Sequence, residues 1–129
     1  AGAHPNVVSE TIEAISADRL ELTKQVMQTI GFYKHNTVAT IELCPAVMAI
    51  LGDDTDGFVD IIRNVDTVDI AILLKGESPN RTRISFRSKG TDVNAIAQQF
   101  GGGGHIRAAG CPIMKNIEEA KSELLEAIG

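Results

Sequence analysis

Aromatic residues are scarce in this chain of 129 residues. It has no tryptophan, one tyrosine and four phenylalanines, so its hydrophobic core has to be built from isoleucine, valine, leucine and alanine. The same scarcity excludes an extended channel in which single-stranded bases stack on aromatic rings. The length is within the usual range for one domain with one core.

Cysteine is also rare, and two thiols are too few for a disulfide framework or a zinc site. Cys44 and Cys111 each precede a proline, which predicts strand ends and two buried thiols without a catalytic role. No apolar run approaches the roughly 20 residues that a membrane-spanning helix needs. For this reason we expect no membrane partner. We therefore expect a reduced, cytoplasmic protein.

Negative charge prevails, but it is unevenly distributed. The formal net charge is −5 at pH 7, which argues against tight, non-specific binding to long duplexes, because that needs a wide basic surface. Residues 75–107 nevertheless hold six basic side chains against Glu77 and Asp92, a local net of +4. A basic island of this size favours a short, charged ligand.

Four consecutive glycines, residues 101–104, stand inside the basic island and precede His105. Glycine loses more backbone freedom on folding than other residues, so the run predicts a close approach by a ligand or another backbone. The Ala-rich segment that follows ends in Gly110 and predicts a short helix with Gly110 as its C-cap. A glycine loop leading into a helix would direct free N–H groups at an anion such as phosphate. A plain flexible loop is the alternative.

Upstream of the glycines, residues 81–90 alternate polar and apolar side chains, which predicts a half-buried strand. Phe86 falls on its apolar face and is expected in the core, whereas Arg87 falls on the polar face. Ser88 lies at the end of the strand. A basic strand beside a glycine loop predicts a cup for a phosphate-bearing ligand, and a solvated strand face is the alternative.

The fold class predicted by the apolar periodicity is α/β, a layered mixed or antiparallel sheet with flanking helices. Asp18 and Asp92 are the expected N-caps of two helices, and residues 68–75 and 82–88 are expected to form an antiparallel hairpin. Leu20, Leu22 and Val26 are expected to point inward. The predicted helices span residues 6–15, 18–30, 46–51, 58–63, 93–100 and 117–128, and the remaining strands 37–43 and 111–114.

Three acidic residues at 53, 54 and 56 are close enough in sequence to suggest a calcium site, but the spacing of a calcium-binding EF-hand loop is absent. Helix capping and solvation are the favoured interpretation of these side chains. The three histidines of the chain, His4, His35 and His105, lie far apart and none stands next to an aspartate.

Four segments together resemble the core of the DHH-associated domain, the C-terminal half of DHH-type phosphoesterases. They are residues 83–90 (RISFRSKG), 93–97 (VNAIA), 100–105 (FGGGGH) and 108–111 (AAGC). The nearest branch contains the nanoRNases and pAp phosphatases, which are related to RecJ-like exonucleases. The resemblance implies that the substrate's terminal phosphate or nucleotide is bound by Gly102, Gly103, Gly104 and His105, with Arg87 and Ser88 as partners. His105 is also a candidate contact for the charge on the scissile phosphate in the transition state. The alternative is a purely structural role, with the ring packed under the glycine loop.

The metal-binding Asp-His-His motifs of such enzymes are missing from this sequence. A two-metal site needs several carboxylate and imidazole ligands converging on the ions, so we expect no catalytic residue and no cofactor here. The divalent metal, Mn or Mg, is expected in a missing N-terminal DHH catalytic domain. Because the chain begins without methionine or a signal-peptide pattern, we expect it to be a fragment. Residues 1–30 would form a helical linker arm, and residues 31–129 the substrate-binding domain.

Two other functions remain open from the sequence. The chain can be a stand-alone nucleotide-binding or regulatory module without catalysis, or a homodimerisation domain whose N-terminal helices form the interface. The substrate also stays open among nanoRNA, pAp, a linear dinucleotide, single-stranded DNA and polyphosphate, with nucleotides preferred because of the Ser-Phe-Arg-Ser-Lys segment.

Overall fold

A six-stranded mixed sheet organises the chain, in a computed structural model that describes residues 16–52 and 55–129. The strand order is β1-β2-β3-β4-β6-β5, in which β2 and β3 run parallel and all other neighbours antiparallel. This confirms the predicted α/β class. The strands are β1 (Gly31–Tyr33), β2 (Val38–Leu43), β3 (Ile70–Ser78), β4 (Arg81–Ser88), β5 (Gly103–His105) and β6 (Ala108–Ile113).

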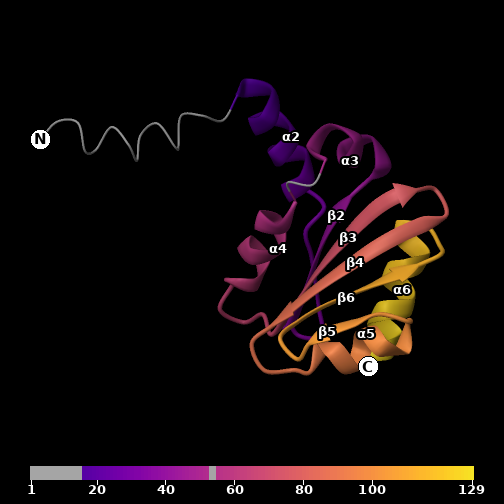
Figure 1. The fold of residues 1–129 in the computed structure, drawn as a ribbon. Coiled ribbons are helices and arrows are strands. Elements are labelled where there is room, and N and C mark those ends of the chain that lie inside the picture. Colours follow the sequence, from indigo (N-terminus) through magenta and orange to yellow (C-terminus); the bar gives the residue numbers. More distant parts are fainter. Residues whose placement is uncertain (1–15, 53–54) are drawn as a thin grey trace, which may run out of the picture.

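Helices cover both faces of this sheet, with α5 and α6 on one side and α2 and α4 on the other (Figure 1). None of the helices in the described ranges is long and apolar enough to span a membrane. The helix expected at 6–15, His4 and two of the three clustered acidic residues lie outside the described residues. The helices are α2 (Ala17–Met27), α3 (Pro45–Leu51), α4 (Asp56–Arg63), α5 (Val93–Gln99) and α6 (Ile117–Ile128).

Strand β3 is the centre of the fold because its apolar run is buried on both faces. Ile72 and Leu74 pack in the cluster shared with α5 and α6, whereas Ala71 and Leu73 pack in the cluster shared with α2, α3 and α4. Near-continuous apolar sequence is what a strand covered on both sides requires. The hairpin predicted between this strand and β4 is confirmed by direct pairing, from Ile70 with Ser88 onward.

The second face of the sheet is covered only in part. In β4 and β6 every second residue is buried with α5 and α6, and Phe86 is fully buried there as predicted. The alternate residues face the other way, where the α2–α4 cluster contains no side chain from β4, β5 or β6. Helix α4 lies against β4 on this side of the sheet, whereas no described side chain of the α2–α4 cluster packs on β6 or β5. We call this side of β4, β6 and β5 the open half-face.

Helices α2, α5 and α6 each begin after a residue whose side chain accepts from a backbone N–H of the first turn, as expected from N-cap chemistry. The Asp92 carboxylate accepts from Ala95 N at 3.1 Å, which confirms the predicted cap of α5. The predicted Asp18 cap is wrong, because Ser16 Oγ accepts from Arg19 N at 3.1 Å and caps α2 two residues earlier than predicted. Asp18 instead lies in the first turn, where its charge complements the helix dipole.

Helix α2 ends at Met27, three residues before the predicted end, because Ile30 already leads into β1. Leu22 and Val26 are buried against the sheet, but Leu20 is 60% exposed, which corrects its predicted inward orientation. In a helix, positions 22 and 26 share one face and position 20 does not. The division of the chain at residue 30 stays a prediction.

One of the two thiols is exposed, contrary to the sequence prediction. Cys44 is the N-cap residue of α3, just past the end of β2, and its thiol is exposed, whereas Cys111 lies inside β6 and is buried. Burial raises the pKa of the Cys111 thiol to about 11. A thiolate is the reactive form of cysteine, so Cys111 is protected both by its burial and by its raised pKa.

Native protein should therefore react with one equivalent of a disulfide reagent such as DTNB at neutral pH, and with a second only after denaturation. The Cys44→Ser variant should show no fast reaction, and Cys111→Ser should keep it. A fast second thiol in the native protein would contradict the burial of Cys111.

Candidate functional site

The glycine run forms a strand and not the start of a helix. Gly103 and Gly104 belong to β5, which pairs with β6 through a two-residue turn at Ile106 and Arg107, so the predicted helix ending at Gly110 is wrong. The reason is close packing between backbones. A Cβ on Gly102 would lie 2.1 Å from Gly110 O and 2.6 Å from Cys111 Cα. The absence of side chains thus lets this segment lie directly on β6.

The amides of the glycine strand are already bonded within the protein. Gly102 N donates to Ala97 O at 2.9 Å, and Gly104 N donates to Asn94 Oδ1 at 2.9 Å. The sequence predicted an anion site formed by free N–H groups at a helix N-terminus. That prediction is wrong for the N–H groups of Gly102 and Gly104, which are bonded within the protein. Their contact with a ligand stays a prediction that has to rest on the surface around them.

Arg87 and His105 lie in one row across the open half-face. Arg87 pairs with Ala108 of β6, and Ala108 pairs in turn with His105 of β5. Directly paired residues carry their side chains on the same face, and two strand spacings amount to about 10 Å. An arginine and a histidine thus flank a single alanine, and their side chains can reach one anion between them.

The arginines of β4 divide into two that share one carboxylate, Glu77, and one that has no described carboxylate partner. Glu77 Oε1 lies 2.6 Å from Arg81 Nε, and Glu77 Oε2 lies 3.3 Å from Arg83 Nε. The hydrogen bond from Arg81, helped by Arg83, lowers the pKa of Glu77 although burial opposes this. Arg87 donates to Phe86 O at 2.9 Å and forms no ion pair with any described carboxylate. Among the described residues, the arginine of β4 without an ion-pair partner is therefore the one beside His105.

His105 itself is exposed, at the end of β5. Its imidazole forms no hydrogen bond with any residue in the described ranges. Both ring nitrogens are thus available to a ligand.

Ser88 lies at the same end of β4 but is only 3% exposed. Its hydroxyl donates to Thr91 O at 2.5 Å, and its N–H donates to Arg107 O at 3.0 Å. The structure thus places this predicted site residue beneath the hairpin turn, joined to it through the backbone. A direct contact between Ser88 and substrate stays a prediction.

Asp69 is a residue near this site that sequence reasoning missed. Its Oδ1 accepts from Gly90 N at 2.8 Å, Lys89 N at 3.2 Å and Thr91 N at 3.3 Å, and its Oδ2 accepts from Thr91 Oγ1. Burial alone would raise the pKa of this carboxyl, but the hydrogen bonds outweigh it and hold the pKa below its ordinary value. The available signal was an acidic residue directly before a buried strand.

This lowered pKa makes a prediction about acid stability. A carboxyl whose pKa is lower in the folded state stabilises the fold above its unfolded pKa, and that contribution is lost as pH falls through the folded value. The free energy of unfolding of Asp69→Asn should therefore lie below that of wild type at pH 7, and the gap should close below the ordinary pKa of 3.8. Urea unfolding of both proteins between pH 7 and pH 3 measures this, and a gap that widens in acid would contradict it.

No metal site forms within residues 16–52 and 55–129, where no three His, Cys, Asp or Glu side chains come together in a suitable cluster. The donor set that a two-metal hydrolytic centre needs is thus not offered by these residues. We assign no metal-dependent step to them.

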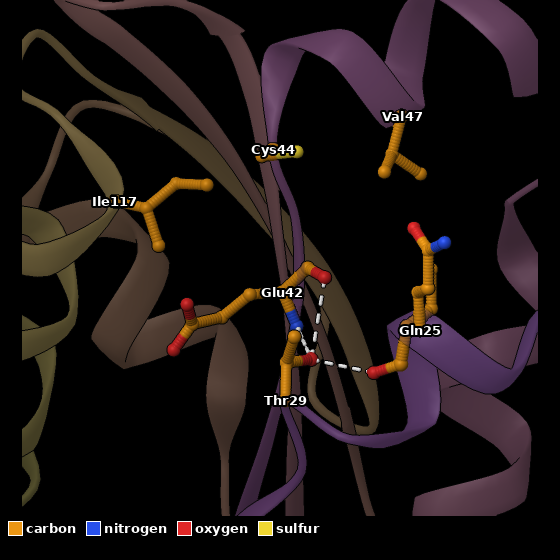
Figure 2. A pocket seen from close by; sticks show the side chains of 7 residues that line it. Gln25, Thr29, Glu42, Cys44, Val47 and Ile117 are labelled. Carbon is orange, nitrogen blue, oxygen red and sulfur yellow. Dashed lines mark hydrogen bonds between the residues drawn. The ribbon is translucent and has the colours of Figure 1, made fainter. Parts of the chain in front are cut away.

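A small pocket lies at the opposite end of the sheet, between α2, the end of β2 and α3 (Figure 2). Its volume is about 230 Å³, and Cys44 and Val47 are among its lining residues. Thr29 Oγ1 donates to Val26 O at 2.7 Å and accepts from Glu42 N at 2.9 Å, so this threonine ties α2 to β2. The hydroxyl of Thr29 therefore has a structural role in this pocket. The pocket is distinct from the open half-face, which lies at the other end of the sheet.

Comparison with known proteins places these features in a family context. The DHHA1 domain family model matches residues 46–129, which includes β3 to β6 and the whole glycine strand. A bifunctional oligoribonuclease and PAP phosphatase NrnA from Thermus thermophilus is 31% identical over 109 residues, covering 83% of this chain and 33% of that protein. The corresponding protein of Mycoplasma pneumoniae is 40% identical over 52 residues, 40% of this chain and 16% of its own length.

Two solved structures share the fold. An exopolyphosphatase-related protein from Bacteroides fragilis has a TM-score of 0.75 and 31% identity, covering 87% of this chain and 34% of its own. A pGpG-specific phosphodiesterase, PggH, from Vibrio cholerae has a TM-score of 0.60 at 18% identity, covering 93% of this chain and 42% of its own. The latter likeness shows the fold alone. The chain thus spans about a third of the length of the relatives that it matches over most of its residues.

Proposed function

This chain belongs to the DHHA1 domain family, and on that premise we propose that it is the substrate-recognition domain of a DHH-type phosphoesterase. Its ligand is the terminal phosphate of a short oligoribonucleotide or of pAp. The observation that carries the proposal is the row Arg87–Ala108–His105 on the open half-face, with an arginine that no described carboxylate neutralises.

The chemistry of this row suits a phosphate. A guanidinium and an imidazole both donate hydrogen bonds, and such bonds to a charged phosphate are shorter and stronger than neutral ones. The small Ala108 between them leaves room for the anion. The glycines contribute by letting their segment lie directly on β6, since a Cβ on Gly102 or Gly104 would clash with its backbone.

The size of the basic surface favours a short substrate. Arg81 and Arg83 are already paired with Glu77, so β4 offers one arginine without a described carboxylate partner and not a continuous basic track. Affinity for long nucleic acid comes from neutralising many phosphates in succession. A site of this extent recognises one end of a short chain.

The proposed division of labour is supported by the coverage of the relatives and by the lack of a metal-ligand cluster among the described residues. The oligoribonuclease and PAP phosphatase NrnA from Thermus thermophilus matches this chain over only 33% of its own length. We propose that the remainder of such a protein, a cytoplasmic DHH catalytic domain, supplies the divalent metal and cuts the bond. The domain described here would bind and orient the substrate for that step.

The competing proposal is a nucleotide-binding module without catalysis. Both proposals agree with the absence of a metal-ligand cluster among the described residues. Both also predict that this chain binds a nucleotide, so a binding experiment does not distinguish between them. The sequence of the full gene product does: an Asp-His-His region upstream supports the enzyme, and its absence supports the regulatory module.

The Arg87→Ala variant tests the row directly. Charge-assisted hydrogen bonds contribute about 1.5–3 kcal/mol each, so the variant should raise the KM of the full-length protein for pAp by about 10- to 100-fold. The kcat should change much less if the guanidinium binds ground state and transition state equally. A loss confined to kcat would contradict this role.

The matched control is Arg83→Ala, four residues earlier on the same strand and the same face. Because Arg83 is already paired with Glu77, its removal should change KM by less than about twofold. Equal effects of the two variants would indicate a general charge effect and not a site.

A further inference from the structure

We propose that Asp69 is a positioning residue that fixes the turn of the β5–β6 hairpin, Ile106 and Arg107, and thereby the placement of His105. This inference rests on the proposed function, because it assigns Asp69 to the support of that binding surface. Asp69 acts through the segment 88–93, which connects β4 to α5 and is bonded to Asp69 on one side and to the hairpin turn on the other.

The first connection runs from Asp69 to the segment. One carboxylate oxygen accepts from three successive backbone amides, those of residues 89–91, and the other accepts from the Thr91 hydroxyl. The backbone adds Lys89 N to Asp69 O at 3.0 Å. Hydrogen bonds to an ionised acceptor are roughly twice as strong as neutral ones, so the carboxylate gives this segment one defined conformation.

The second connection runs from the segment to the hairpin turn. Val93 N donates to Ile106 O at 2.9 Å, and Ser88 N donates to Arg107 O at 3.0 Å. The Ser88 hydroxyl meanwhile bonds Thr91 O within the segment, and Ile106 O lies 3.5 Å from the same hydroxyl oxygen. Both carbonyls of the two-residue turn are therefore held from outside the hairpin.

The hairpin turn needs such support because its own backbone does not specify it. Two-residue connections between antiparallel strands favour turns with one or two residues at positive φ, usually glycine or asparagine. Neither Ile106 nor Arg107 has a positive φ in this structure. The turn therefore adopts a less favoured form, which the bonds from Ser88 and Val93 stabilise.

The functional consequence concerns His105, the residue directly before this turn. Its pairing with Ala108 across the turn sets its distance from Arg87. Displacing a binding group by about 1 Å can cost up to about 100-fold in rate. Asp69 thus contributes to phosphate binding through the backbone that it holds.

The experiment compares Asp69→Ala with Asp66→Ala in this chain. Asp66 is an exposed carboxylate three residues earlier and makes no hydrogen bond with the described residues, so it controls for the loss of one negative charge. Amide hydrogen exchange is measured at Ser88 and Val93, and the Kd for pAp is measured by NMR titration. Thr91→Val removes only the hydroxyl bond and serves if Asp69→Ala does not fold.

Asp69→Ala should speed exchange at Ser88 and Val93 by about tenfold or more, leave the β3 amides protected, and weaken pAp binding by about tenfold. Thr91→Val should shift both readouts in the same direction by less, and Asp66→Ala should change neither. An unchanged Kd despite lower stability would overturn the proposal, because Asp69 would then be a structural residue only. If wild-type protein does not bind pAp, the proposed function fails, and exchange alone decides: protection retained at both amides overturns the positioning role.

Discussion

The His105→Ala variant of the full-length protein should lose about 100-fold or more in kcat while its DHHA1 domain stays folded. The size of the loss follows from removing one donor to a charge that develops in the transition state. Folding should be unaffected because the imidazole is exposed and bonds no described residue, and surface substitutions of this kind stay within about 0.5 kcal/mol. Steady-state turnover of pAp and of a short 5′-phosphorylated RNA measures the effect.

The control for this variant is His35→Asn. His35 is equally exposed but lies in the turn between β1 and β2, with a positive φ of 58°, which asparagine tolerates better than most residues. It should keep wild-type turnover. Unchanged kinetics in His35→Asn together with unchanged kinetics in His105→Ala would exclude His105 from the reaction.

The Gly102→Ala variant should show the largest loss of stability, about 3 kcal/mol or more. The added methyl would meet Gly110 O at 2.1 Å and two atoms of Cys111 at 2.6 Å, so backbone and not a flexible side chain would have to move. Overpacking in well-packed regions costs about 1–3 kcal/mol and sometimes more. For a domain of this size the melting temperature should fall by about 10 °C.

Gly90→Ala is the matched comparison, since its methyl would be 3.7 Å from Asp69 Oδ1, an ordinary contact. It should change stability by less than about 0.5 kcal/mol. A Gly102→Ala protein as stable as Gly90→Ala would show that β5 does not pack on β6 as described, and thermal unfolding followed by circular dichroism measures both.

Most of the sheet and its helices could be predicted from local patterns in the sequence. The alternation in β4 placed Phe86 in the core and Arg87 on the opposite face, because a strand exposes every second residue to each side. Asp92 marked the start of α5 since its side chain satisfies an N–H that the helix leaves unbonded. Such signals depend on residues near one another in the chain, which is why they can be read without the structure.

The glycine segment could not be predicted in this way. Glycine carries no side chain whose spacing would indicate a strand, and the alanines that follow have a high helix propensity. The deciding contacts join Gly102 to Gly110 and Cys111 across the hairpin, and Asn94 of α5 to Gly104. Tertiary packing overrides local propensity here.

The role of Asp69 was hidden for a similar reason. Its partners lie about twenty residues further along the chain, in the segment that follows β4. The exposure of Leu20 and Cys44 was also not predicted. It depends on how α2 and the end of β2 pack in the fold, which local sequence does not reveal. The candidate site was thus found as a set of residues, whereas its supports came only from the structure.

The central claim, that this domain recognises a phosphate through Arg87 and His105, is tested most directly by an NMR titration of this chain with pAp. We predict amide and side-chain shifts that centre on Arg87, Ala108 and His105, the row that crosses β4, β6 and β5. A short 5′-phosphorylated RNA should shift the same signals. No shift at millimolar pAp, or shifts confined to the far end of the sheet, would contradict the claim.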